Sequence, residues 1–153
     1  MTEIRPAHSN DLETVSHWLR SQADCEMWAG HRVSFPVDTT ALPAAIEWCK
    51  SHSWAVLFRS KVVAFGQLVP KPAGRLHLAR IIVAPDHRAK GHGRTLSVHL
   101  LDAAVEAGAS VVSLNVSNEN EKAIALYRSL GFTEADRPVD EPESSSRYMT
   151  HAV

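Results

Sequence analysis

Two glycines and several cationic side chains lie together in the middle of the chain, in the stretch APDHRAKGHGRTL, residues 84–96. The stretch follows an apolar run and precedes an apparently helical one. Backbone N–H groups at the start of a helix carry partial positive charge, and glycine lets an anion come close because it has no Cβ. The residue types and their spacing therefore predict an anion site, and a phosphate is the anion we expect there.

The spacing argues against two common kinds of phosphate loop. No Gly-Lys-Ser/Thr follows four residues after a glycine, as it does in P-loop nucleotide-binding proteins. In the dinucleotide-binding pattern a third glycine would stand where this chain has Leu96. The remaining pattern, Arg-x-x-Gly-x-Gly-Arg from Arg88 to Arg94 with Lys90 inside it, suits a diphosphate lying across the N-terminus of a helix.

The elements that must position this loop can be predicted from hydrophobic periodicity. Three β-rich runs precede it, SWAVLF, KVVAFGQLV and RLHLARIIV, and they predict an antiparallel meander. After the loop, apolar residues recur every three or four positions and predict a helix that ends at Gly108. The run SVVSLNV predicts another strand, and NEKAIALYRSLGF predicts a second helix that stops at Gly131.

The segments that flank this region also carry signals for helices, strands and loops. TEIRPAH predicts a strand, and SNDLETVSHWLRSQ predicts a helix with Ser9, Asn10 and Asp11 as capping residues. Residues 23–40 are expected to be a loop with at most a short helix, TTALPAAIEWCKSH to be helical, DRPVDEPESSS to be a mobile loop, and SRYMTHAV to be a final strand. The fold class is therefore α/β with an α+β mixed sheet, formed by residues 1–153 as a single domain.

Composition narrows the function classes. The chain has 153 residues, 44% of them hydrophobic, and a net charge of −1, which gives no general attraction to nucleic acid or membranes. Cys25 and Cys49 lie far apart, and no secretory segment or membrane span is seen, so we expect a cytoplasmic protein with reduced thiols. Nine histidines are scattered without a zinc-binding spacing, so no metal site is expected.

Together, IIVAPDHRAKGHGRTL and SLNVSNENEKAIALYRSLGF resemble the GNAT superfamily of N-acetyltransferases. Its first motif, [QR]-x-x-G-x-[GA], matches Arg88, Gly91 and Gly93. Its second, N-x-x-A-x-x-x-Y-x-x-x-G-F, matches Asn120, Ala123, Tyr127, Gly131 and Phe132. The resemblance covers residues 76–132. It implies a central, mostly antiparallel sheet with two splayed central strands flanked by helices, and acetyl-coenzyme A as the cosubstrate.

The resemblance also implies where the cosubstrate binds. The pyrophosphate would lie in the glycine loop and the pantetheine arm between the two splayed strands, with the backbone N–H of Val83 polarising the thioester carbonyl. The residues assigned to it in this way are Ile81, Ile82, Val83, Arg88, Ala89, Lys90, Gly91, His92, Gly93, Arg94, Thr95, Asn120 and Ala123.

The implied reaction is direct attack of a primary amine on the thioester, with a small amine, an amino acid, or a protein N-terminus or lysine as acceptor. Tyr127 would supply the proton or hydrogen bond that the leaving thiolate needs. The base is open, because residues 76–84 contain no carboxylate and Asn115 stands where some members of the family carry a glutamate. Asn115 could bind a water or the acceptor. His77, an even number of residues from Val83, is a candidate base, and so are Asp24, Glu26 and His31.

The sequence leaves two alternatives open for the residues of the acceptor pocket. Trp18, Trp28 and Phe35 could stack on an acceptor or pack in the core, and Asp140, Glu141 and Glu143 could attract a cationic amine or form a solvated acidic loop. A homodimer is left open.

Two other functions compete with the enzyme. The missing carboxylate would suit a non-catalytic acyl-coenzyme A binding module. A local cationic cluster could instead bind nucleic acid, through Arg75, Arg80, Arg88, Lys90 and Arg94.

Overall fold

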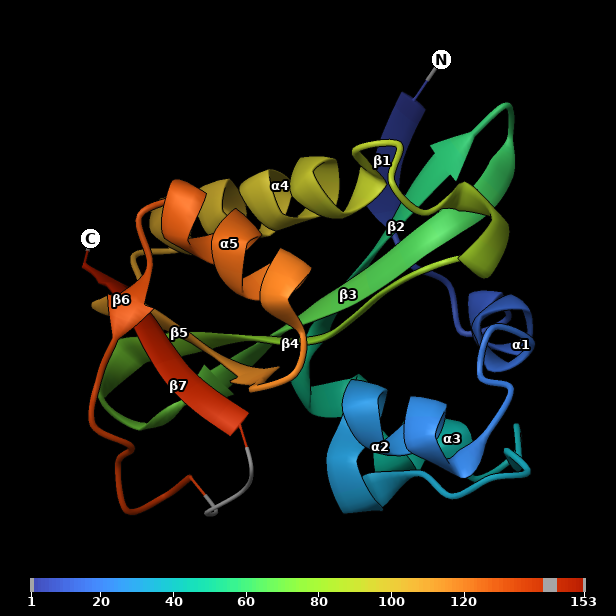
Figure 1. Ribbon diagram of the computed structural model, residues 1–153, viewed down its shortest axis with the longest axis horizontal. Coiled ribbons are helices and arrows are strands. Elements are labelled where there is room, and N and C mark those ends of the chain that lie inside the picture. Colours follow the sequence, from blue (N-terminus) through green and yellow to red (C-terminus); the bar gives the residue numbers. More distant parts are fainter. Residues whose placement is uncertain (1, 142–145, 153) are drawn as a thin grey trace.

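A seven-stranded sheet forms the centre of the molecule in the computed structural model, which describes residues 2–141 and 146–152 (Figure 1). Its order is β1-β2-β3-β4-β5-β7-β6, and every neighbouring pair is antiparallel except β4 and β5. The strands are β1 (Thr2–Pro6), β2 (His52–Phe58), β3 (Lys61–Lys71), β4 (Arg75–Val83), β5 (Val111–Ser117), β6 (Thr133–Glu134) and β7 (Ser146–Ala152). The predicted mixed sheet is confirmed.

Helices cover both faces of the sheet and bury two separate apolar clusters. α4 (His92–Glu106) and α5 (Glu121–Ser129) lie side by side on one face, above the sheet in Figure 1. α1 (Asp11–Ser16), α2 (Gln22–Ala29) and α3 (Leu42–Ala45) lie on the other. Leu96, Leu114 and Tyr127 belong to the first cluster, and Trp28 and Phe65 to the second. A side chain that packs in the first cluster therefore lies on the face covered by α4 and α5, and one that packs in the second lies on the face covered by α1, α2 and α3.

The two parallel strands separate soon after they pair. β4 and β5 are in register only at Leu76–Leu78 opposite Val112–Leu114, although β4 continues to Val83 and β5 to Ser117. On their outer sides both strands keep their partners, β3 and β7. An opening between β4 and β5 results, with Ala79 and Asn115 as the first residues beyond the last pair.

A bulge in β4 lies at the start of this opening. Ala79 pairs with Gln67 and Ile82 with Phe65, so Arg80 and Ile81 together face Gly66 alone. Arg80 has a φ of +51°, the left-handed conformation that non-glycine residues seldom adopt. A Cβ on Gly66 would lie 3.0 Å from the Ile81 side chain and 3.1 Å from that of Leu96, so these side chains would have to shift to admit one and the close approach favours glycine.

The bulge corrects the face expected for His77. The flanking Leu76 and Leu78 pack in the cluster under α4 and α5, so His77 points to the opposite face. Val83 packs on the α4 side, because the extra residue in the bulge inverts the alternation. In a regular strand, an even number of residues between His77 and Val83 would place both side chains on the same face. The bulge places them on opposite faces, so this expectation was wrong.

Most predicted elements after residue 52 are present, whereas the N-terminal helices differ in extent. The predicted helix from Ser9 to Gln22 is only α1, and residues 39–52 contain α3 and a 3-10 turn at Trp48–Lys50. The short helix allowed for residues 23–40 is α2, which begins one residue earlier. Of the predicted caps, Asn10 makes no side-chain capping bond, and the Asp11 carboxylate instead binds the His8 N–H and Arg5. No helix in the described ranges is long and apolar enough to cross a membrane.

Gly131 ends α5 as predicted. Its φ is +100°, and the Phe132 N–H that follows donates to the Tyr127 carbonyl at 3.0 Å. A Cβ at this position would lie 2.9 Å from Nε2 of His151.

We expect Gly131→Ala to lower the free energy of unfolding by about 1–2 kcal/mol, because an L side chain strains the left-handed backbone and meets the His151 ring. Urea denaturation measures this. In a His151→Ala background, the destabilisation caused by the clash with the His151 ring should disappear, and the destabilisation caused by the left-handed backbone should remain. A Gly131→Ala protein as stable as the wild type would contradict the assignment.

Candidate active site

The glycine loop joins the end of β4 to the start of α4. Ala89 and Gly91 both have positive φ, +62° and +86°, and Gly91 is the residue that caps α4. The first turn of α4 begins at His92, so its backbone N–H groups point out of the helix end. Arg88 donates from Nε to the Val83 carbonyl at 3.2 Å, which holds its guanidinium beside the end of β4. This local geometry fits the predicted anion site.

Two small residues leave room at this site. A Cβ on Gly91 would meet no atom within 4 Å, and one on Gly93 would meet only Val83 Cγ2 at 3.6 Å, an ordinary contact. Substitution at Gly93 is therefore compatible with the fold and would fill space in front of the helix end. His92 is buried with its ring 5.7 Å from that of Phe58, so its side chain serves packing and its backbone N–H belongs to the loop.

The backbone of β4 presents donors to the opening. The Ala84 N–H donates to the Val63 carbonyl on β3 at 2.8 Å. Successive N–H groups of a strand point to opposite sides, so the Val83 N–H points away from β3, toward β5. This direction agrees with the predicted role of Val83 as the group that polarises the carbonyl.

α5 carries the other predicted residues of the cofactor side. Asn120 caps the helix, and its Oδ1 accepts from the Ala123 N–H at 3.3 Å. Tyr127 is buried against Phe132 on the same side of the sheet as α4. Burial raises the pKa of Tyr127 to about 12, with the nearby Ser97 hydroxyl acting in the opposite direction. The phenol is therefore protonated at neutral pH and is a donor.

His77 and Asn115 meet on the opposite face, at the start of the opening. Leu114 and Val116 pack under α4 and α5, so Asn115 between them points the other way. The Asn115 Oδ1 accepts from Nη1 of Arg137 at 2.6 Å, which turns its Nδ2 toward Nε2 of His77, 3.4 Å away. His77 Nε2 therefore carries the lone pair, and Nδ1 donates its hydrogen to Ser113 Oγ at 2.7 Å.

His77 is neutral in this setting. Burial lowers its pKa to about 4, although the nearby Glu141 carboxylate acts in the opposite direction. A base with this pKa is weak against an alkylammonium group, whose ordinary pKa is about 10.4. The geometry favours His77 as the hydrogen-bond partner that orients Asn115.

The acidic tail segment is tied to the sheet. Glu141 is buried and accepts from Nη1 of Arg75 at 3.1 Å, and Lys71 lies 3.5 Å away. Burial opposes its ionisation, but His77, Arg75 and Lys71 outweigh this and hold its pKa below the usual range. Asp140 also binds Arg75, at 2.6 Å. A solvated acidic loop was therefore a wrong expectation for Glu141, and Glu143 lies outside the described residues.

The cationic residues weighed as a nucleic-acid surface, the weaker alternative to coenzyme A binding, do not form one surface. Arg75 is buried and paired with Asp140 and Glu141, and Arg80 is held by Gln67 and by Glu47 at 3.3 Å, all on the face opposite α4. Arg88, Lys90 and Arg94 alone belong to the glycine loop. The interpretation as a nucleic-acid surface was therefore wrong.

Sequence reasoning missed the groups around the bulge. Arg80 donates to Gln67 and pairs with Glu47, and its carbonyl accepts from Trp28 Nε1 at 2.8 Å. Trp28 also packs 6.2 Å from Phe65, so it is a core residue. No sequence motif indicates the bulge, and without it these residues have no reason to meet.

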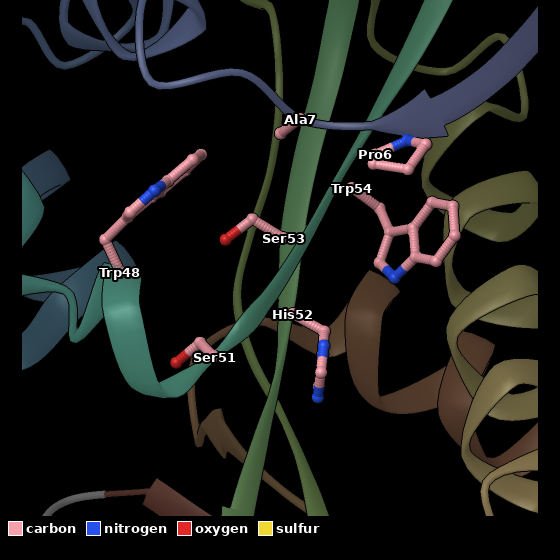
Figure 2. Close-up of a pocket in the computed structure, with 7 residues that line it drawn as sticks. All are labelled: Pro6, Ala7, Trp48, Ser51, His52, Ser53 and Trp54. Atoms are coloured by element: carbon pink, nitrogen blue, oxygen red, sulfur yellow. The ribbon is translucent and has the colours of Figure 1, made fainter.

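Two cavities among the described residues lie away from the bulge and the glycine loop. One of about 270 Å³ is at the edge of β2; Figure 2 shows Trp48, Ser51 and Ser53 on one side of the strand and His52 and Trp54 on the other. A second, of about 370 Å³, lies between β3, β4 and the C-terminal end of α4. Neither is lined by residues 80–95. The strand register, in which β4 and β5 part beyond Leu78 and Leu114, marks the opening between them as the candidate site.

The comparisons with known proteins agree with this geometry. The sequence profile of the acetyltransferase (GNAT) family matches residues 12–132, which is most of the chain. The chain belongs to this family. The GNAT family resemblance seen in the two motifs is thereby confirmed, together with the expected sheet and its splayed strands.

Individual relatives extend the comparison. Over 58 residues, 38% of this chain, it is 50% identical to streptothricin acetyltransferase of Streptomyces lavendulae and 47% identical to [ribosomal protein bS18]-alanine N-acetyltransferase of Escherichia coli K12. These matches span only 31% and 39% of the two relatives. The crystal structure of the E. coli ribosomal-protein-S18-alanine N-acetyltransferase covers 99% of this chain and 94% of its own, with 28% identity and a TM-score of 0.73.

A third likeness concerns the fold alone. Spermidine N-acetyltransferase from Vibrio cholerae, solved with coenzyme A and spermine, covers 99% of this chain and 95% of its own. Its TM-score is 0.77 at 21% identity. The GNAT fold of this chain is thus shared with proteins whose names state different acceptors.

We expect Gly93→Val to lower the affinity for coenzyme A at least about 10-fold, because the branched side chain fills the space in front of the first turn of α4. Isothermal titration calorimetry measures this. Ala107→Val adds the same kind of side chain at the exposed far end of α4 and should leave the affinity unchanged. Normal affinity in Gly93→Val would overturn the assignment of the glycine loop.

Acid should destabilise the protein through His77. Its folded pKa of about 4 lies below the ordinary 6.5, so between these pH values the unfolded chain binds the proton and the folded one does not. The free energy of unfolding should therefore fall as the pH drops from 6.5 to 4, by up to about 3 kcal/mol from this group. His77→Gln should flatten this slope, and substitution of the exposed His17 by Gln should not. An imidazole NMR signal of His77 titrating near 6.5 would contradict it.

Proposed function

We propose that the protein transfers the acetyl group of acetyl-coenzyme A to a primary amine by direct attack on the thioester. The observation that carries this proposal is the opening between β4 and β5, which has the glycine loop at its end and the Val83 N–H on its β4 side. A tetrahedral oxyanion needs a fixed donor, and the Val83 N–H points toward the opening. Membership in the GNAT family supports the same reaction.

The cosubstrate would use residues of three elements. Its pyrophosphate would lie across the first turn of α4 near Arg88, Lys90 and Arg94. Its pantetheine arm would run along residues 81–83 of β4 in place of the missing β5 partner. Support comes from the strand register, which leaves this edge of β4 without a neighbour in the described chain, and from the coenzyme A in the V. cholerae structure.

The two proton transfers would occur on different sides of the sheet. Tyr127 on α5, with its pKa of about 12, is protonated and can donate to the departing thiolate. On the other side Asn115, oriented by His77 and Arg137, can bind the acceptor or a water that takes the amine proton. The amine must arrive on that side, because α4 and α5 cover the other one.

The family does not fix the acceptor. The relatives are named for streptothricin, for the alanine of a ribosomal protein and for spermidine, which share only an amine. A small-molecule amine, an amino acid or a peptide is therefore the acceptor class that we propose for this chain.

A thiol-release assay with acetyl-coenzyme A and a panel of amines, amino acids and peptides tests this function. We expect thiol release with at least one acceptor, and about a 100-fold or greater loss of kcat in Tyr127→Phe with nearly unchanged coenzyme A affinity, since the phenol acts in the chemical step.

The outcomes separate the alternatives. Unchanged turnover in Tyr127→Phe would remove this residue as the acid. Coenzyme A binding without thiol release for any acceptor would favour the non-catalytic acyl-coenzyme A binding module.

A further inference from the structure

Arg137 lies on the acceptor side of the opening. It donates from Nη1 to Asn115 Oδ1 at 2.6 Å and from Nη2 to the Ser146 carbonyl at 3.0 Å, and its guanidinium carbon lies 5.7 Å from the centre of the Tyr148 ring. Asn115 is the first β5 residue beyond the last β4–β5 pair. The Arg137 guanidinium is thereby fixed where the opening begins.

The nearby arginines are paired with carboxylates, whereas Arg137 has no such partner among the described residues. Arg75 is matched by Asp140 and Glu141, and Arg80 by Glu47. Within residues 2–141 and 146–152 no carboxylate oxygen lies within 4.0 Å of the Arg137 guanidinium, whose hydrogen-bond partners are neutral oxygens. A guanidinium has five N–H donors, so donors remain for a further acceptor.

The partners of Arg137 among the described residues hold its guanidinium without neutralising its charge. Two strands supply them, β5 through Asn115 and β7 through Ser146 and the Tyr148 ring. Nη1 donates to Asn115 and Nη2 to both Ser146 oxygens, so Nε–H and the second N–H of Nη1 remain and can each donate a hydrogen bond to a carboxylate. The charge of Arg137 is therefore open to an anion and would repel a second cation.

We propose that Arg137 binds a carboxylate of the acceptor, so that the preferred substrate carries a carboxylate close to its amine and is not a polyamine. This rests on the proposed acetyltransferase function. The carboxylate could belong to a free amino acid or to an acidic residue next to the N-terminus of a peptide, and both place one negative charge near the attacking nitrogen. The pairing of Asp140 and Glu141 with Arg75 agrees, because these carboxylates are not available to a cationic chain.

The test compares acceptors that differ only in charge. Steady-state acetylation is measured for free amino acids and their amides, for peptides with Asp or Asn at the second position, and for spermidine. We expect the carboxylate member of one pair to have a KM about 10- to 100-fold lower, and spermidine to be a poor acceptor. The pair that shows the difference identifies the source of the carboxylate.

Arg137→Gln removes the charge and keeps an amide that can bond to Asn115. It should raise the KM of the carboxylate acceptor about 10- to 100-fold more than that of its amide, whose KM changes only through the orientation of Asn115, and it should leave coenzyme A affinity unchanged. Arg128→Gln, at an exposed α5 arginine that binds Glu134, is the matched control and should change none of these values. Equal effects on both members of a pair, or equal KM values in the wild type, would overturn the proposal.

A binding measurement separates this proposal from the function on which it rests. In the coenzyme A complex, the Arg137 and Asn115 side-chain NMR signals should shift with the carboxylate acceptor and not with its amide. Such shifts without acetyl transfer would refute the function and leave the anion site standing. Transfer to acceptors without any charge-dependent shift would refute the anion site.

Discussion

The structure depends on a strand pairing that stops early. Three residue pairs join β4 to β5, and beyond them each strand keeps only its outer neighbour. The bulge at Arg80 and Ile81 marks this change, and Gly66 opposite it lets Ile81 and the Leu96 side chain of α4 approach closely. Unsatisfied backbone groups along the separated strands are costly unless another partner takes them. An extended ligand is the partner that this geometry suits.

Around the opening, polar residues on distant segments hold one another in place. Arg75 and Lys71 fix Glu141, and Asn115 fixes Arg137, so the segment that follows β6 is tied to both β4 and β5. The buried charges of Arg75 and Glu141 are matched, which is the condition under which such groups are tolerated away from water. His77 joins this network as a neutral ring and thereby fixes the orientation of the Asn115 amide.

The sequence was informative where a local pattern determines the structure. The glycine loop, the amphipathic helix after it and the stop at Gly131 depend on neighbouring residues, and all were predicted. The face of His77 was not, because one extra residue in a strand inverts every later side chain and leaves no local mark. Arg137 was overlooked for a related reason: its partners lie 22 and 9 residues away, and only the folded sheet brings them together.

The placement of Tyr127 and Asn115 on opposite faces of the sheet has a consequence for proton balance. Leu114 and Val116 separate the two faces with apolar packing along β5. The opening between β4 and β5 is the place where a bound thioester would be reached from both faces. The proton of the acceptor would leave on the Asn115 side, whereas the proton of the buried Tyr127 would be replaced through the opening.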